Sequence, residues 1–177
     1  MNQNYTQYCG VDVSKSTLDY IVLQPEDDTR LDRQNIQSLS EEFKRIPNSL
    51  EQINQCFKSE SFDKTLFVIE STGSYSSKIL HELSELNRSI CLVSPFQSKC
   101  YMAAKGVTNK NDKNAAFCLA IMGKNEQLRT YQAPSSAMQQ HKQILSTYQA
   151  MQKQQRMLEN QIHALQQHAI ILSLIHI

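Results

Sequence analysis

The chain has 177 residues, a net charge of +1 and 20% charged residues, so it can hold one domain with an appendage but not two full domains. Its five cysteines form no CxxC pair, which argues against a disulfide scaffold and favours reduced thiols in an intracellular protein. No apolar run approaches the length of a membrane span, and the amino terminus lacks a secretion signal. We therefore expect a cytoplasmic protein that does not engage a membrane.

Apolar runs and turn residues predict a mixed α/β domain, with an early antiparallel hairpin and a later pair of parallel strands joined by a helix. Strands are expected at 8–13, 18–23, 65–70 and 89–93, with a weaker strand near 33–39. Three helices are expected: one that starts at Leu50 with an Asn or Ser N-cap, one over 78–87, and one after Asp112 through AAFCLAIM.

The first strand, within YCGVDVSKST, carries an aspartate among apolar residues. Alternation puts Cys9, Val11 and Val13 on one face, and Gly10 and Asp12 on the other. A buried carboxylate without a partner is costly, so Asp12 either lies at a solvated edge or is held by a positive group. A metal ion is one such group.

Three acidic residues stand out by position: Asp12 within the first strand, Glu70 at the end of a buried strand, and Asp112 at the start of a helix. Ligands in such sheets bind beyond the strand ends, where these carboxylates can converge on Mg²⁺ or Mn²⁺ for phosphodiester chemistry. Each has a structural alternative, since Asp12 could be solvated, Glu70 could pair with Lys78, and Asp112 could be a helix N-cap.

A locally basic stretch runs from Gln97 to Arg129. Its best candidates for contacts to nucleic acid are Lys99, Lys105, Lys110 and Lys113, together with Tyr101 for base stacking. The alternative for each lysine is an ordinary solvated surface position.

The last third of the chain has a heptad pattern, with steps of four and three from Ala137 to Leu172 that are interrupted in polarity mainly by His141 and Gln155. This pattern predicts a long helix that forms a coiled coil, and hence a homo-oligomer through residues 137–172. The alternative is a helix that packs on its own domain.

Four stretches resemble, in order, the successive motifs of the DEDD insertion-sequence transposases, which include Piv-type invertases and bridge-RNA-guided transposases. They are CGVDVSKSTLDYIVL, VIESTGSY, VSPFQSKCYMAAKG and KNDKNAAFCLA, and together they cover about residues 8 to 120. The resemblance implies an RNase H-like (RuvC-like) fold, DNA transposition and recombination, and DNA as partner, with a guide RNA in one branch of the family. It also implies four carboxylates that bind Mg²⁺ or Mn²⁺.

The chain departs from the family pattern at two points. Asp12, Glu70 and Asp112 match the first three carboxylates, but the fourth falls on Ala115, where only an amide from Asn111 or Asn114 could substitute. The resemblance also implies a carboxy-terminal domain with a serine nucleophile, and the chain stops within the preceding helix. We expect a metal site impaired in at least one position and no complete strand exchange by this polypeptide alone.

The expected organisation is a RuvC-like domain at 5–124, a linker at 125–135 and a coiled-coil helix at 136–171. We expect residues 172–177, LSLIHI, to be a non-native tail, because a reverse translation matches the end of a sequencing-library adapter. Two other functions stay open: a catalytically degenerate fragment that binds nucleic acid or its own kind, and an actin-like ATPase. The ATPase would need glycine-rich phosphate loops, and the chain has four glycines.

Overall fold

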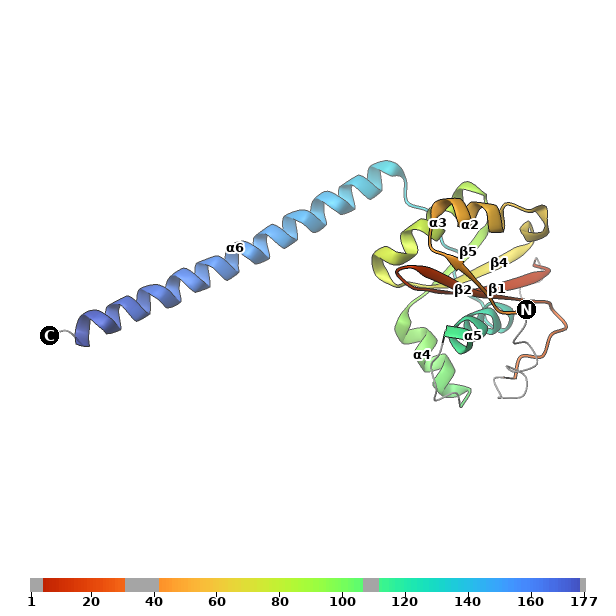
Figure 1. The fold of residues 1–177 in the computed structure, drawn as a ribbon, viewed down its shortest axis with the longest axis horizontal. Helices are drawn as coiled ribbons and strands as arrows, with labels where there is room; N and C mark the ends of the chain where they lie inside the picture. Colours follow the sequence, from red (N-terminus) through yellow and green to blue (C-terminus); the bar gives the residue numbers. More distant parts are fainter. Residues whose placement is uncertain (1–4, 31–41, 107–111, 176–177) are drawn as a thin grey trace. The chain divides into compact units, whose positions relative to one another are not determined.

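A five-stranded mixed sheet forms the centre of the first part of the chain (Figure 1). The computed structural model describes residues 5–30, 42–106 and 112–175, and the chain divides into two compact units, Met1–Ala133 and Pro134–Ile177. The strands are β1 (Gln7–Val13), β2 (Thr17–Leu23), β3 (Lys44–Pro47), β4 (Thr65–Glu70) and β5 (Ser89–Val93). The helices of this unit are α2 (Leu50–Phe57), α3 (Ser77–Glu85), α4 (Pro95–Ala104) and α5 (Asp112–Asn125), with short 3-10 turns η1 (Glu60–Phe62) and η2 (Gly73–Ser76).

The sheet order is β3-β2-β1-β4-β5. Strands β1 and β2 pair antiparallel, as do β2 and β3, whereas β1 and β4, and β4 and β5, pair parallel. A tight turn joins β1 to β2, in which the Ser14 backbone N–H donates to the Thr17 carbonyl at 2.9 Å. The predicted fold class, a mixed sheet with flanking helices, is confirmed.

Helices cover both faces of the sheet: α2 and α3 lie on one side, and α4 and α5 on the other (Figure 1). The predicted alternation along β1 is confirmed, because Cys9, Val11 and Val13 belong to a buried cluster that includes Ile53 of α2 and Ile79 of α3. Tyr8, on the opposite face, packs in a cluster with Cys118, Leu119 and Met122 of α5. Asp12 therefore belongs to the face covered by α5.

Two elements differ from the expectation. The weak strand expected near 33–39 lies outside the described residues, and the strand that pairs with β2 is β3, whose sequence KRIP is mostly exposed and lacks apolar alternation. Helix α4, which begins at Pro95, is not among the expected helices. Ser94 and Gln97 form a capping box at its start, with Pro95 in the first turn.

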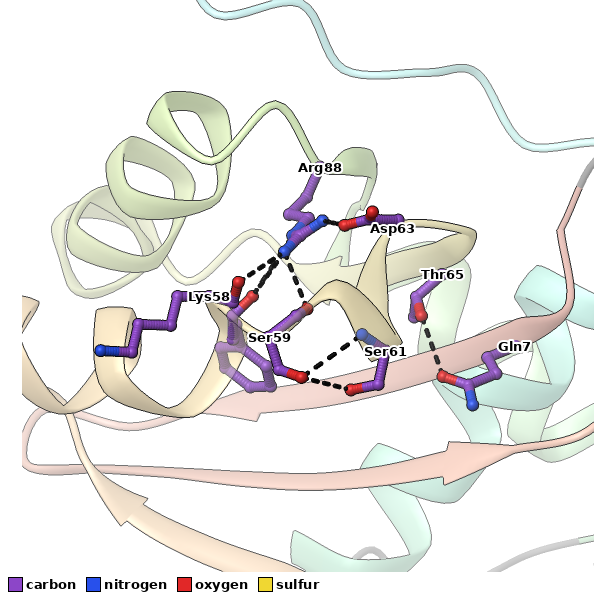
Figure 2. A network of polar contacts seen from close by, with 8 residues as sticks. Gln7, Lys58, Ser59, Ser61, Asp63, Thr65 and Arg88 are labelled. Carbon is purple, nitrogen blue, oxygen red and sulfur yellow. Dashed lines mark hydrogen bonds and ion pairs between the residues drawn. The ribbon is translucent and has the colours of Figure 1, made fainter.

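A buried arginine joins the end of α3 to the end of α2 (Figure 2). Asn87, with a φ of 55°, ends α3 and turns the chain back, so that Arg88 points at the last turn of α2. The Arg88 guanidinium donates to the carbonyls of Phe57, Lys58 and Ser59 at 3.0–3.2 Å, and pairs with Asp63. The Phe57 carbonyl is among those that a helix end leaves without internal partners, and Lys58 and Ser59 directly follow the helix.

The second unit contains one helix of 40 residues, α6 (Ser136–Ile175), so the predicted long helix is confirmed. Among the residues of α6 whose burial is described, several apolar heptad positions are exposed, namely Ile144, Tyr148, Leu158 and Ile162. None of the described helices is both long and apolar enough to cross a membrane.

Candidate functional site

Four charged residues form a row across four neighbouring strands. Asp19 of β2 is paired in register with Arg45 of β3 on one side and with Asp12 of β1 on the other. The parallel register that pairs Val11 with Ile69 brings Asp12, one residue further along, beside Glu70 at the end of β4. We call Arg45, Asp19, Asp12 and Glu70 the charged row.

The charged row lies on the face of the sheet that α5 covers. Gly10, two residues before Asp12, has no space for a side chain, because a Cβ there would lie 2.0 Å from the carbonyl oxygen of Ala116 in α5. Ile21, two residues after Asp19, packs against the same helix. Val68, two residues before Glu70, does so as well. Side chains two residues apart on a strand share a face, so the carboxylates of the row project toward α5.

Glu70 is buried, with 4% of its surface exposed, and it is held by α4. The Ser98 hydroxyl donates to Glu70 Oε2 at 2.5 Å. Charge-assisted hydrogen bonds of this kind are short and strong, so they fix the direction of a carboxylate. The capping box and the proline in the first turn of α4 start the helix at the point that brings Ser98 to Glu70.

Asp112 begins α5 and meets the other end of the charged row. The guanidinium of Arg45 donates from Nε to Asp19 Oδ1 and from its terminal NH₂ group to Asp112 Oδ2, both at 2.8 Å. The Asp19 side chain is 13% exposed, whereas those of Arg45 and Asp112 are 58% and 61% exposed. The hydrogen bond and charge of Asp19 raise the pKa of Arg45, so the guanidinium is a fixed positive charge between two carboxylates.

The donor chemistry of this region suits a hard divalent cation, because carboxylate oxygens are the ligands that Mg²⁺ and Mn²⁺ prefer. Asp12 and Glu70 come from adjacent parallel strands, and Asp112 begins the helix that covers them. Within the described residues, however, no three side chains of His, Cys, Asp or Glu are grouped in an arrangement that could hold a metal ion. The carboxylate of Asp112 contacts Arg45 instead.

The position of the expected fourth carboxylate is enclosed. Ala115 is 3% exposed and Asn114 is 9% exposed, and both lie in the first turns of α5. Asn111, the other amide considered as a substitute ligand, lies outside the described residues. The sequence left open a pairing of Glu70 with Lys78. In the structure Ser98 is a partner of Glu70, and Lys78 Nζ donates to the Asn48 carbonyl at 3.0 Å.

The basic residues singled out from the sequence differ in their surroundings. Lys99, Lys105 and Lys113 are exposed, and Lys110 lies outside the described residues. Tyr101 is partly buried against two core clusters, which raises the pKa of its hydroxyl, and Lys105 Nζ lies 5.4 Å from the centre of its ring. The lysines are therefore on the surface, whereas the tyrosine is partly core.

Asp19 and Arg45 were not among the predicted site residues. They line a hollow together with Phe43, Lys44, Asp112 and Lys113. Lys113 Nζ lies 5.6 Å from the centre of the Phe43 ring at this hollow. Asp19 could have been found from the sequence, because a tight turn at Ser14–Thr17 fixes the hairpin register and sets Asp19 opposite Asp12.

Comparisons with known proteins agree with the resemblance. Residues 9–170 match the family model DEDD_Tnp_IS110, described as Transposase. Among solved structures, the RuvC of Thermus thermophilus is similar at 10% identity and a TM-score of 0.43, covering 71% of this chain and 99% of that one. RuvC of T. thermophilus in complex with a Holliday junction substrate is similar at 11% identity and a TM-score of 0.47, covering 72% and 100%. No curated protein sequence matches the chain. Because the family model spans nearly the whole sequence, the chain belongs to the DEDD transposase family of the IS110 type.

Proposed function

We propose that the charged row and the start of α5 form the metal-dependent site at which this transposase acts on the phosphodiester backbone of DNA. Asp12, Glu70 and Asp112 are the proposed ligands of Mg²⁺ or Mn²⁺. One observation carries the proposal: the carboxylates of Asp12 and Glu70 stand on adjacent parallel strands, beneath the helix that Asp112 begins.

Divalent ions in such sites polarise phosphate oxygens and stabilise the charge that develops during phosphodiester cleavage. The residues of this chain hold the proposed ligands in position. The Ser98 hydroxyl bonds the buried carboxylate of Glu70 and helps to orient it, and the close approach of β1 to α5 at Gly10 fixes the strand that carries Asp12. Preorganised ligands of this kind lower the cost of ordering the site when an ion enters.

The direct test is Mn²⁺ binding by the full chain, measured by isothermal titration calorimetry. Asp12→Asn and Glu70→Gln should each weaken the affinity by a factor of about ten or more, since each removes a charged ligand. Lys64→Gln, a change of an exposed residue just before β4, is the control and should have no such effect. Retention of the wild-type affinity by both acid variants would refute the proposed site.

Ala115→Asp tests the missing fourth ligand in the same assay. Residue 115 lies three positions after Asp112, so an aspartate there would share a helix face with it. We expect tighter Mn²⁺ binding, and an unchanged or weaker affinity would argue against a metal site that is impaired at this position. Ala115→Asn, which adds a side chain of the same size without the charge, is the control.

We also propose that the exposed lysines on α4 and α5 contact DNA, or a guide RNA where one is used. Lys99, Lys105 and Lys113 are surface residues on the two helices that cover the charged-row face; Lys110 belongs to the same proposal by sequence. Replacing all four with glutamine should weaken duplex binding and reduce the salt dependence of log K by about 0.9 per lost phosphate contact. A small change in affinity would indicate that nucleic acid binds elsewhere.

A second candidate function is a nucleic-acid-binding fragment without catalysis. The methyl group of Ala115 and the pairing of Asp112 with Arg45 favour it. DNA binding by a protein that does not bind Mn²⁺ would support this alternative, and a chain that binds both would support the first proposal. We further propose that α6 associates with a second copy of the chain through residues 137–172.

A further inference from the structure

We infer that Arg45 is a built-in competitor of the metal: its guanidinium and a divalent cation require the same Asp112 carboxylate. The inference rests on the proposed function, because it assumes that Asp112 is a ligand. It assigns control over the affinity of the site to an arginine of β3, which lies outside the four motif stretches of the sequence.

The geometry of Arg45 makes it a bridge between two elements. One planar guanidinium contacts Asp19 through Nε and Asp112 through a terminal NH₂ group, at 2.8 Å each. Since the nitrogen atoms of a guanidinium are fixed in one plane, the two contacts also fix the distance between the edge of the sheet and the first residue of α5. Asp112 accordingly has a specific cationic partner before any metal ion arrives.

The two contacts differ in how readily they are broken. Asp19 is largely enclosed, so its bond to Arg45 is partly shielded from water, whereas both Asp112 and Arg45 are more than half exposed, so the ion pair between them is weakened more by solvent. A cation with two positive charges should therefore displace Arg45 from Asp112 while Arg45 stays on Asp19. Arg45 would then set the threshold of metal binding without leaving the site.

Lys44 offers a matched control. It precedes Arg45 in β3, lines the same hollow and carries the same charge, but alternation on the strand directs its side chain to the other face. Removing Lys44 takes one positive charge from the same strand and the same hollow. It leaves the Arg45 bonds to Asp19 and Asp112 in place.

The experiment measures Mn²⁺ affinity by calorimetry on the full chain and on the variants Arg45→Met, Lys44→Met, Asp112→Asn and Arg45→Met/Asp112→Asn. We expect Arg45→Met to tighten binding by about 1.5-fold to 5-fold, the range set by an exposed ion pair. Lys44→Met should have a clearly smaller effect. In the Asp112→Asn background, Arg45→Met should have no effect, because the contested carboxylate is gone.

The inference is overturned if Arg45→Met weakens Mn²⁺ binding or leaves it unchanged, if Lys44→Met has an equal effect, or if the gain persists without Asp112. Arg45→Lys, which keeps the charge but lacks the two-pronged contact, should give an intermediate affinity and guards against a folding defect in Arg45→Met. Loss of binding in Asp12→Asn and Glu70→Gln with a neutral Arg45→Met would refute this inference alone. Absence of Mn²⁺ binding in every protein would refute both it and the proposed metal site.

Discussion

The hydrogen bond from Ser98 to Glu70 is a buried polar contact of the candidate site. Glu70 is 4% exposed and Ser98 is 3% exposed, so neither can exchange its partner for water without a rearrangement. Burial without partners is costly for a carboxylate, and this serine therefore contributes both to the stability of the domain and to the orientation of the ligand.

Ser98→Ala should lower the free energy of unfolding by about 1–3 kcal/mol, because it removes a charge-assisted bond and leaves the carboxylate less satisfied. Urea unfolding followed by circular dichroism measures the change. In a Glu70→Gln background the same substitution should cost less, since the amide is neutral. An equal cost in both backgrounds would show that Ser98 acts through helix α4 and not through Glu70.

At the scale of single residues, the sequence predicted that Asp12 lies within a strand, Glu70 at the end of a strand and Asp112 at the start of a helix, and the structure has them there. Their role as metal ligands stays a prediction. Asp19 was missed although the hairpin register implies it. Arg45 could not be predicted, since its role depends on the β2–β3 register and on where α5 begins, and both are set by packing between distant segments. Local patterns carry no information on such contacts.

At the scale of elements, apolar runs predicted β1, β2, β4 and β5, because their residues are buried on both faces of the sheet. Strand β3 was missed because an edge strand with a polar sequence has no such signal. Helix α4 was missed because its start is marked by the capping residues Ser94 and Gln97 and by Pro95 in its first turn, and not by a periodic apolar pattern. Pairing and capping, not hydrophobicity, define these two elements.

The link between α2 and α3 gives a prediction at the same scale. Arg88 is 7% exposed and donates to three carbonyls at the end of α2, so Arg88→Met would leave those carbonyls without these donors (Figure 2). We expect a loss of about 2–4 kcal/mol in the free energy of unfolding, measured in urea. Lys58→Met is the control, because Lys58 takes part through its carbonyl while its side chain is exposed. Equal stability of the two variants would contradict this role.

At the scale of the whole molecule, the mixed sheet followed from the order of strands and helices along the chain, since a strand–helix–strand unit forms a parallel pair. The long helix α6 followed from its heptads. The heptads did not predict which surface packs against α6, because the same pattern suits a helix of a second copy or a surface of the same chain.

The heptad positions of α6, which we call its seam, can be told apart from the other exposed residues of the helix by their spacing. Tyr148, Met151, Leu158 and Ile162 continue the heptad steps, and Leu158 is 59% exposed, whereas Met157, 55% exposed, lies off the seam. If a second copy covers the seam, burial of each such side chain contributes about 1.5–3 kcal/mol. Substituting two of them should therefore prevent association at micromolar concentrations.

We expect Leu158→Ser/Ile162→Ser to convert the wild-type oligomer to a monomer in analytical ultracentrifugation, and Met157→Ser to leave it intact. Dissociation should also reduce helical circular dichroism, because an isolated helix lacks the packing that stabilises most helices in proteins. A wild-type chain that sediments as a monomer would refute self-association through α6. If the double variant is still an oligomer, the copies associate through another surface, because the heptad positions have then lost two large apolar side chains without an effect on association.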